Sequence, residues 1–401
     1  MAISRRALLG ATMAGLPRWS SAQQKAPIRI GVLGDMNGPY ADFGGPGSVA
    51  AARLAAEEFG SVLGRPVEIV AADHQNKPAI AASIAQGWID TNDVVAVVEC
   101  ATSGAALALQ QVLRDKRRIF LITVAGSSDL TNRACSPVGF HFNCDTYALA
   151  RGPARALTMQ GDNTWFFITV DYAFGHALER DAARFVAEAG GKVLGTIRHP
   201  LGTSDFSSYL VAARASGAKV IAFANAGQDA QNAIKQAAEF GIGRRGERLT
   251  ALLLFITDVR AVGLELAQGL VLSNSFYWDL NDATRAWTKR FQQAFKPVPP
   301  TMNQAAGYAS VRHCLRAIQQ TGSTEAQAVA AAMRNLPVND MYNDNVAIRA
   351  DGRVLSKMYL MQVKAPGKSA YRDDDYEVVL ATPGAEVFRP VAESECSLMR
   401  T

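Results

Sequence analysis

The sequence predicts an α/β protein with two doubly wound parallel-sheet lobes, joined by three hinge crossovers. Short apolar runs alternate with helical segments, which is the pattern of parallel strands buried on both faces. The alternation comes in two series, separated by residues 132–145. Three helical segments then follow without strands between them, so we expect the chain to return and cover the first lobe.

The first series begins at residue 28 and is centred on residues 94–131. That stretch reads as an apolar run, a small polar turn, a helix, a second apolar run and a second small polar turn, which is a parallel βαβ unit. The strands expected in this series are Ile28–Leu33, Val67–Ala72 and the runs that start at Val94 and Ile119. The expected helices are Gly47–Phe59, Pro78–Asp90 and Ala105–Asp115.

The second series repeats the same rhythm after the loop. Its expected helices are Tyr147–Gln160, Phe174–Ala189, Phe206–Ala215 and Ala230–Phe240. Its expected strands are Trp165–Val170, Lys192–Arg198, Val220–Ala224, Ala251–Ile256 and Leu270–Phe276. Two such series predict two similar lobes.

The last third of the chain supplies helices to the first lobe and strands to the second. The expected elements are helices Asp282–Phe295, Met302–Gln320 and Thr324–Asn335, and extended segments Met358–Val363 and Tyr376–Leu380. We therefore expect residues 26–143 and 280–341 to form one lobe, residues 144–279 and 342–385 the other, and residues 386–401 a C-terminal tail. Hinges are expected near Phe142–Asp145, Tyr277–Leu280 and Met341–Asn345.

Residues 1–22 have the features of an export signal. Ser4-Arg5-Arg6 precedes a short apolar stretch, and the paired arginines resemble a twin-arginine signal. Without the three leader arginines, Lys and Arg fall from 41 to 38 against 36 acidic residues, which leaves a net charge of about +2. We expect an exported, soluble, periplasmic protein, with no basic stripe for nucleic acid.

Five cysteines, an odd number, are spread along the chain, and no two have the spacing of a zinc site. One or two disulfides are compatible with an oxidising compartment, but the spacing does not assign the pairs.

The two small polar turns of the central unit are the first candidate ligand site. One turn is Ala101-Thr102-Ser103-Gly104, and the other is Ala125-Gly126-Ser127-Ser128, so both turns end neighbouring parallel strands. Open α/β sheets bind ligands at this edge. With Ser103 as the N-cap of the following helix, backbone N–H groups and the helix dipole favour an anion such as a carboxylate.

Aromatic side chains follow several of the expected strands. Tyr40 and Phe43 follow the first strand, Tyr172 and Phe174 follow Trp165–Val170, and Tyr277 follows the strand at 270–276. Together they would form an apolar pocket that accepts a ring, although each one alone fits ordinary packing equally well. The remaining candidates are polar residues after second-lobe strands, Asn225 and Asp258. Asp258 is equally compatible with a ligand ammonium and with a helix cap.

The sequence gives little support for a nucleotide-binding site or for a metal or catalytic site. Residues 45–50 match G-x-G-x-x-A, yet the segment Gly34–Gly44 separates them from the preceding strand, whereas a nucleotide fingerprint needs a tight turn. A loop leading into a helix is the simpler interpretation. The five histidines form no metal-binding motif, and no G-x-S-x-G elbow occurs. We expect no metal, no cofactor and no enzymatic activity.

Several segments, in order along the chain, carry a resemblance to a known family. They are GDMNGPYADFG (34–44), DHQNKP (73–78), TVAGSSDLT (123–131), DYAFG (171–175) and QGL (268–270). From residue 28 to about 390 the chain resembles the type I periplasmic binding proteins of ABC importers, particularly the leucine/isoleucine/valine-binding group. HPLGTSDFSSYL (199–210) and FYWDLN (276–281) resemble a branch that is associated with aromatic acids.

The resemblance implies roles for individual residues. The family's carboxylate clamp falls on Ser103, Ala125 and Ser127, its aromatic contacts on Phe43 and Tyr172, and its ammonium-binding acid near Asp258. Ser127 replaces the usual Thr, and Thr123-Val124 replaces the usual Ser-Pro. The resemblance also implies a disulfide between Cys135 and Cys396.

The expected function is capture of a small carboxylate, either an aromatic acid or a branched-chain or aliphatic amino acid. Two lobes would close on the ligand, and a monomeric protein would deliver it to an ABC permease. One alternative is a sensing module that signals to a separate receptor. A nucleotide-dependent enzyme using residues 45–50 is a further alternative.

Overall fold

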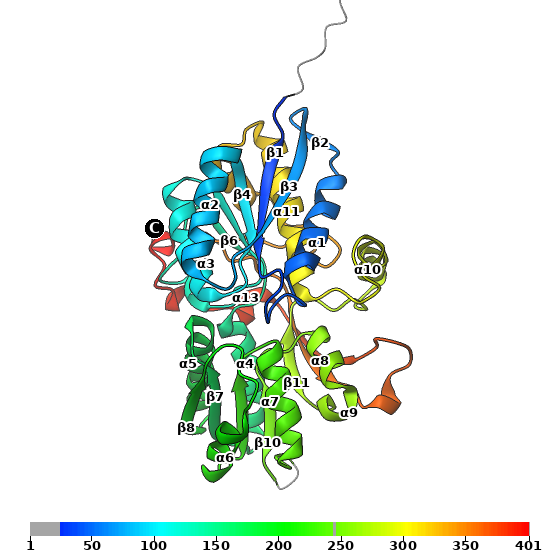
Figure 1. The fold of residues 1–401 in the computed structure, drawn as a ribbon. Helices are drawn as coiled ribbons and strands as arrows, with labels where there is room; N and C mark the ends of the chain where they lie inside the picture. The colour runs from blue at the N-terminus through cyan, green and yellow to red at the C-terminus, as the bar shows by residue number, and fades with distance from the viewer. Residues whose placement is uncertain (1–24, 244–245, 401) are drawn as a thin grey trace, which may run out of the picture.

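The computed structural model describes residues 25–243 and 246–400, and its sheets lie in two halves (Figure 1). The first half contains a six-stranded sheet, and the second half contains a four-stranded and a three-stranded sheet. The predicted export signal, residues 1–22, lies outside the described residues. Within those residues, every helix is too short or too polar to span a bilayer.

The six-stranded sheet has the order β2-β3-β1-β4-β5-β6. All neighbours are parallel except β2, which pairs antiparallel with β3 and was not predicted. The short β6 was not predicted either. The strands are β1 (Ile28–Gly34), β2 (Ser61–Val62), β3 (Arg65–Asp73), β4 (Val94–Glu99), β5 (Ile119–Ile122) and β6 (Gly139–His141). The central strands β4 and β5 are buried at every residue, as the apolar runs predict.

Helices cover both faces of this sheet, and some come from the last third of the chain (Figure 1). They are α1 (Gly45–Glu57), α2 (Pro78–Asn92), α3 (Ser103–Asp115), α10 (Asp282–Ala294), α11 (Met302–Thr321) and α12 (Ala326–Asn335). α11 packs against α1, so the chain does return to the first half. Thr301 begins α11 with a capping box, since its hydroxyl accepts from the Gln304 N–H and the Gln304 side chain accepts from the Thr301 N–H.

The second half contains a parallel sheet of order β10-β9-β7-β8 and an antiparallel sheet of order β11-β12-β13. The strands are β7 (Thr164–Val170), β8 (Lys192–His199), β9 (Val220–Ala224), β10 (Arg248–Ala251), β11 (Val271–Asn274), β12 (Met358–Val363) and β13 (Tyr376–Thr382). The helices are α4 (Thr146–Met159), α5 (Ala173–Glu188), α6 (Ser207–Ala215), α7 (Gln228–Glu239), α8 (Ile256–Val262), α9 (Leu264–Ala267) and α13 (Gly384–Val387).

One predicted strand was misplaced. Residues 251–256 were expected to form a strand, but β10 ends at Ala251 and α8 begins at Ile256. The intervening residues Leu252–Phe255 are buried although they form a loop. A segment that is buried on all sides consists of consecutive apolar residues, whether it is a strand or a loop. The period-two alternation that would identify a strand is then missing.

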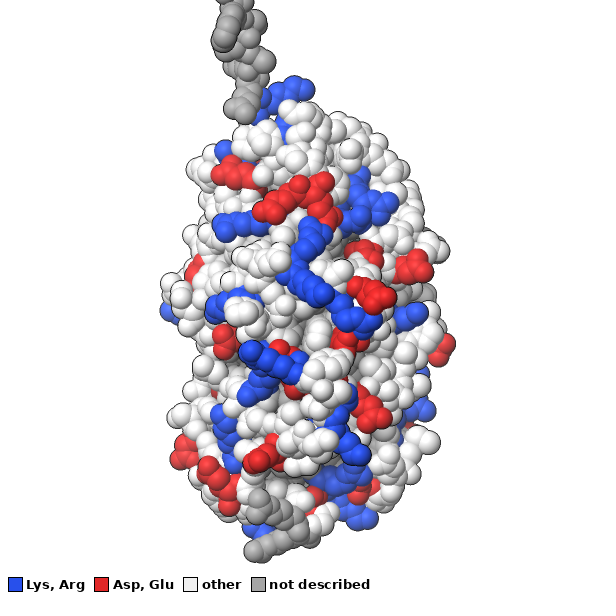
Figure 2. Space-filling model, turned by 90° about the vertical axis from the view of Figure 1, so that its right-hand side faces the viewer, with Lys and Arg blue, Asp and Glu red and all other residues white. Residues whose placement is uncertain are grey.

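The surface carries charges of both signs. Figure 2 shows the side of the molecule that bears α8, α9 and α10 in Figure 1, where Lys and Arg are interspersed with Asp and Glu across both halves.

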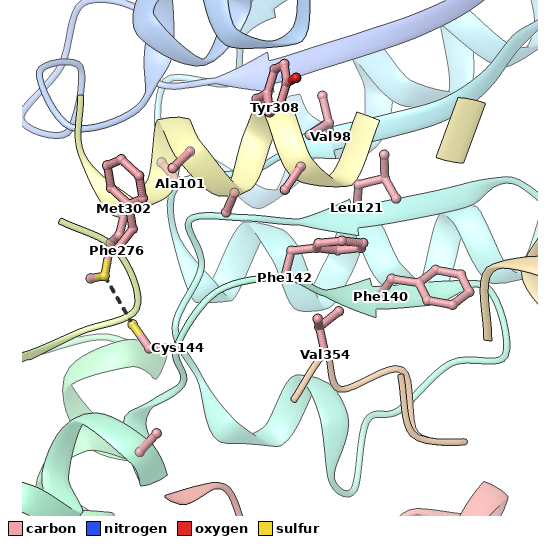
Figure 3. Close-up of a cluster of buried hydrophobic side chains, with 14 of the residues drawn as sticks. Val98, Ala101, Leu121, Phe140, Phe142, Cys144, Phe276, Met302, Tyr308 and Val354 are labelled. Carbon is pink, nitrogen blue, oxygen red and sulfur yellow. Dashed lines mark hydrogen bonds between the residues drawn. The ribbon is translucent and has the colours of Figure 1, made fainter. Parts of the chain in front are cut away.

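The core of the first half continues to the boundary between the halves. Figure 3 shows Leu121 of β5, Phe140 of β6 and Phe142, which directly follows β6, on the same side of the sheet as Met302 and Tyr308 of α11. Phe142 and Cys144 are buried where the chain leaves this sheet for α4. The thiol of Cys144 contacts the Met302 sulfur at 3.7 Å, which ties this segment to the start of α11 (Figure 3).

Arg353 is fully buried at this boundary and organises the same segment. Its guanidinium forms an ion pair with Asp145 at 3.0 Å, donates to the backbone oxygens of His141 and Asn143, and lies 4.5 Å from the ring centre of Phe388. Asp145 is also the N-cap of α4. The buried charge is therefore compensated by one carboxylate and by carbonyl groups.

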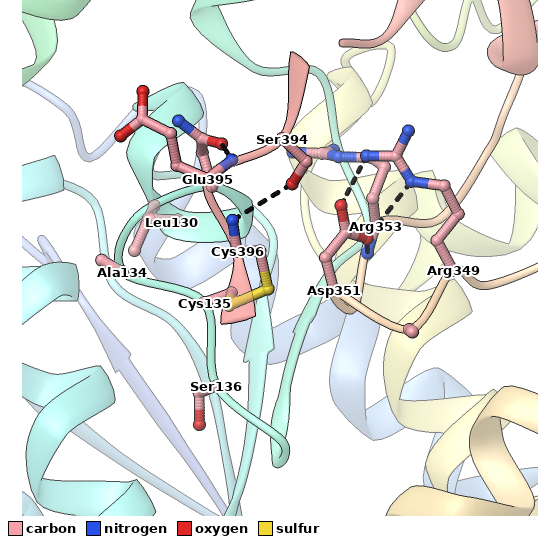
Figure 4. Close-up of a disulfide and its surroundings, with 12 residues drawn as sticks. Leu130, Ala134, Cys135, Ser136, Arg349, Asp351, Arg353, Ser394, Glu395 and Cys396 are labelled. Carbon is pink, nitrogen blue, oxygen red and sulfur yellow. Dashed lines mark hydrogen bonds and ion pairs between the residues drawn. A yellow bond between two sulfur atoms is a disulfide. The ribbon is translucent and has the colours of Figure 1, made fainter. Parts of the chain in front are cut away.

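The C-terminal tail is fixed to both halves. A disulfide joins Cys135 to Cys396, the pair that the resemblance implies, and the Glu395 N–H donates to Asn132 (Figure 4). On the second half, Glu393 forms an ion pair with Arg184 at 2.8 Å. The tail thus connects the loop after β5 to α5.

Candidate ligand site between the two halves

Loops at the carboxyl ends of the parallel strands meet between the halves and enclose a small cavity. We call it the inner cavity, and its walls are apolar and aromatic. They are formed by Tyr40, Phe43, Ala101, Val124 and Gly126 of the first half and Tyr172, Phe174, Ala226, Leu253 and Phe255 of the second. Its volume of about 20 Å³ holds roughly one water molecule. The halves are therefore in contact around it.

Two tyrosine hydroxyls meet across this boundary. The Tyr40 hydroxyl lies 2.8 Å from the Tyr172 hydroxyl. Burial is the main reason why the pKa of both phenols is raised, and the charge of nearby Asp229 adds to the effect. Both side chains are neutral at physiological pH. Two neutral hydroxyls have two protons and use one between them, so one O–H remains available to an acceptor in the cavity.

Aromatic stacking and a close backbone approach complete the contact. The rings of Phe43 and Phe255 stack with their centres 4.2 Å apart. Gly227, at the start of α7, has φ 61° and ψ −138°, a conformation that is accessible mainly to glycine. A Cβ there would lie 2.9 Å from the Pro39 oxygen and 3.0 Å from the Phe43 ring. A glycine is therefore required for the halves to approach this closely.

The predicted carboxylate-binding turns lie side by side, but several of their polar groups bond to one another. The Ser127 N–H donates to the Ser103 hydroxyl at 3.0 Å, and the Ala125 N–H donates to the Cys100 oxygen. The Ser127 hydroxyl accepts from the Asp129 N–H at 3.3 Å. Gly126 lines the inner cavity, whereas Gly104 lies in the first turn of α3. Direct contact of these turns with a ligand remains a prediction.

Ser103 does not cap α3 as the sequence predicts. The helix begins at Ser103, its N-cap is Thr102, and the Thr102 side chain makes no capping bond. The Ser103 hydroxyl instead bridges to the neighbouring turn, as described above. The Thr102 hydroxyl is buried and has no hydrogen-bond partner among the described residues. This leaves a polar group near the cavity wall residue Ala101.

The other three polar or aromatic candidates do not line the inner cavity. Asp258 lies in the first turn of α8, where its side chain caps the helix by accepting from the Phe255 N–H at 2.9 Å, and burial raises its pKa to about 6. Its role as a helix cap is therefore observed. The Asn225 amide lies 3.1 Å from His199 Nε2, and the Tyr277 hydroxyl donates to the Asp373 oxygen.

The start of α1, where the nucleotide alternative places a pyrophosphate, is already occupied by a carboxyl group. The Gly45 N–H donates to Glu99 Oε1 at 2.7 Å. Glu99 is fully buried, and burial raises its pKa to about 8. In addition, a Cβ at Gly47 would collide with the Gln304 side chain, so the glycines serve packing. In the described part of the chain, no three His, Cys, Asp or Glu side chains gather as a metal site would require.

Sequence reasoning missed four of the cavity residues. They are Val124, Ala226, Leu253 and Phe255. All four follow parallel strands, so position at the sheet edge was an available signal. Their side chains, aliphatic in three and aromatic in Phe255, resemble those of ordinary core residues, and only the closeness of the two halves distinguishes them.

Comparison with known proteins identifies the chain. Residues 27–369 match the family described as periplasmic binding protein. The chain belongs to the periplasmic binding protein family. A periplasmic binding protein from Burkholderia mallei is 45% identical, with a TM-score of 0.90 over 93% of this chain and 99% of that one. The fold and the resemblance predicted from sequence are thereby confirmed.

Two further solved structures are binding proteins of ABC transporters. The periplasmic ligand-binding protein of a branched-chain amino acid ABC transporter from Burkholderia xenovorans is 36% identical, with a TM-score of 0.82 and coverage of 93% of this chain and 100% of that one. An ABC transporter solute-binding protein from Rhodopseudomonas palustris in complex with benzoate is 18% identical, with a TM-score of 0.81 and coverage of 92% and 99%. At that identity the second likeness shows the fold alone.

Homologues of this periplasmic binding protein are therefore ABC transporter substrate-binding proteins, and its family consists of binding proteins, not enzymes. The solute-binding role predicted from the sequence is confirmed.

Proposed function

We propose that this periplasmic binding protein captures a small aromatic carboxylate between its halves and delivers it to an ABC permease. The observation that carries the proposal is the composition of the inner cavity. Its walls are aromatic or aliphatic, and the hydroxyls of Tyr40 and Tyr172 meet at the boundary. Aromatic walls with a few orienting polar groups suit a ring that bears one polar substituent.

Ligand binding requires the halves to separate and close again, because the inner cavity as it stands holds about one water molecule. We assign residues 26–143 and 280–341 to one lobe, and residues 144–279 and 342–385 to the other. Hinges lie near residues 142–145, 277–280 and 341–345. A ring held between Phe43 and Tyr172 would then replace direct contact between the halves. Closure also removes water and strengthens the polar contacts to the carboxylate.

The carboxylate would lie near the turns at Ser103 and Ser127. The two hydroxyls and the Ser127 N–H already form a connected group there, and the start of α3 adds a favourable dipole. Any ligand bond to Ser103 or Ser127 would be made in exchange for an internal one. We further propose that the mature protein is exported to the periplasm and acts as a monomer.

A branched-chain amino acid is the second candidate, favoured by the relative from Burkholderia xenovorans. An amino acid needs an acceptor for its ammonium group. Asp258 is committed to the Phe255 N–H and to Gln231, at 2.9 and 2.7 Å. This commitment favours an acid without an ammonium group.

A thermal-shift experiment distinguishes the two ligands. The mature protein is heated alone and with benzoate, cinnamate or leucine, since a ligand that binds the folded state raises the unfolding temperature. We expect a shift with benzoate or cinnamate and none with leucine. A shift with leucine alone would replace the proposed ligand by an amino acid. No shift with any of the three would reject the proposal.

A further inference from the structure

A second, larger cavity lies between the halves beside the inner one. We call it the outer cavity. It has a volume of about 340 Å³ and is formed by Met36, Phe295 and Val298 of the first half and Thr257 and Arg260 of the second. Two segments line both cavities with different residues: Tyr40, Phe43 and Phe255 face the inner cavity, and Asp42 and Thr257 face the outer one. Thr257 and Arg260 belong to α8 and Phe295 follows α10, so the cavity lies on the side of the molecule that carries these two helices in Figure 1.

The outer cavity has an apolar base and two unused polar groups. Met36, Phe295 and Val298 supply apolar surface. The Thr257 hydroxyl is buried and has no hydrogen-bond partner within residues 25–243 and 246–400. A buried hydroxyl without a partner is unfavourable, so rotation of the Thr257 side chain toward an acceptor in the cavity would gain a hydrogen bond that the protein alone does not make. The Lys296 ammonium lies 5.0 Å from the Phe295 ring centre, and no carboxylate of the described chain pairs with it.

The remaining charges restrict what the cavity accepts. Arg260 is paired with Asp373 at 3.2 Å, so it contributes little free positive charge. Asp42 places one negative charge on the wall. One free ammonium and one carboxylate favour a ligand with a single negative charge over a dicarboxylate, because the second charge would meet Asp42.

We propose that the outer cavity is a second binding site, which accepts a small monocarboxylate with an apolar chain. The carboxylate bonds to Lys296 and Thr257, and the chain lies on Met36, Phe295 and Val298. This site goes beyond the proposed function and does not depend on the ligand of the inner cavity. Because its walls come from both halves, its ligand favours their contact and slows the release of any molecule held in the inner cavity.

Titration calorimetry with hexanoate tests the proposal. We expect saturable binding of hexanoate and no binding of 1-hexanol, which has the same chain without the charge. The double variant Lys296→Gln/Thr257→Val should bind hexanoate at least about ten-fold more weakly, which corresponds to the loss of one charge-assisted hydrogen bond. Lys289→Gln, on the exposed face of α10, is the matched control and should bind normally.

A second pair of variants separates the two cavities. Val298→Trp fills the outer cavity and should abolish hexanoate binding. Tyr172→Phe removes one hydroxyl from the wall of the inner cavity and adds no bulk between the halves, so it should leave hexanoate binding unchanged. Absence of hexanoate binding, its persistence in Val298→Trp, or its loss in the inner-cavity variant would overturn the proposal.

Discussion

The hydroxyl of Tyr40 in the first half lies 2.8 Å from the hydroxyl of Tyr172 in the second, at the edge of an apolar cavity. Apart from this pair, the walls of that cavity are aliphatic or aromatic. Removing one of these two hydroxyls therefore changes the polarity of the cavity wall while leaving its shape almost unchanged.

Replacing Tyr172 by Phe keeps the ring and removes one hydroxyl. We expect about five-fold weaker binding of an aromatic carboxylate, because one hydrogen bond contributes about 1 kcal/mol. Calorimetry measures the change. Tyr209→Phe is the control, since Tyr209 packs on His199 and Phe206 away from the inner cavity. Equal affinity in Tyr172→Phe and the wild type would show that this hydroxyl makes no bond to the ligand.

Gly227→Ala should weaken ligand binding by about ten-fold or more, because its methyl group prevents the contact that closes the halves. Gly217→Ala is the matched control. Both glycines have positive φ, 61° and 67°, but a Cβ at Gly217 meets nothing within 4 Å. Both variants should lose stability through backbone strain, and only Gly227→Ala should lose affinity. Calorimetry and urea unfolding together measure the two effects, and similar affinities in both variants would contradict the steric argument.

Glu99 should make stability depend on pH. Burial raises its folded-state pKa from 4.5 to about 8, so its contribution to stability is complete below about pH 4.5 and is lost as the pH rises through 8. Glu99→Gln should therefore decrease the difference in urea midpoint between pH 5 and pH 9. The exposed Glu57→Gln is the control. An identical pH profile in Glu99→Gln and the wild type would mean that this carboxyl titrates normally.

Arg353→Met should lower the free energy of unfolding by about 3–5 kcal/mol, because it leaves Asp145 buried without its partner. Arg29→Met is the comparison. Its ion pair with Glu68 is similarly short, at 2.7 Å, but is partly exposed, with 28% and 47% of the two side chains accessible, and should contribute less than about 1 kcal/mol. Urea unfolding measures both, and equal losses would contradict the role of burial.

Sequence patterns predicted the fold well where an apolar run ends at a turn residue. Strands β9 (Val220–Ala224) and β12 (Met358–Val363) have the predicted bounds. The run at 251–256 was misassigned, because complete burial removes the periodicity that distinguishes a strand from a loop. The three-residue β6 was too short to give a pattern.

The sequence predicted where the candidate site lies, but it did not predict which hydrogen bonds its polar side chains make. The edge of the sheet was expected to hold the ligand, and Tyr40, Phe43, Gly126 and Tyr172 do line the inner cavity. Which group a polar side chain bonds to depends on distances between segments far apart in the chain. The bond from the Ser127 N–H to the Ser103 hydroxyl, and the use of Asp258 as a cap, are of this kind.

The link between Cys135 and Cys396 closes a covalent ring that contains the entire second half and every segment that passes between the halves. A single proteolytic cut in a surface loop of that ring, such as the turn at Gly202, yields two polypeptides that remain one molecule. They would separate on a denaturing gel only after a thiol reagent had been added. A nicked protein in an oxidising compartment therefore retains both parts of its ligand-binding surface.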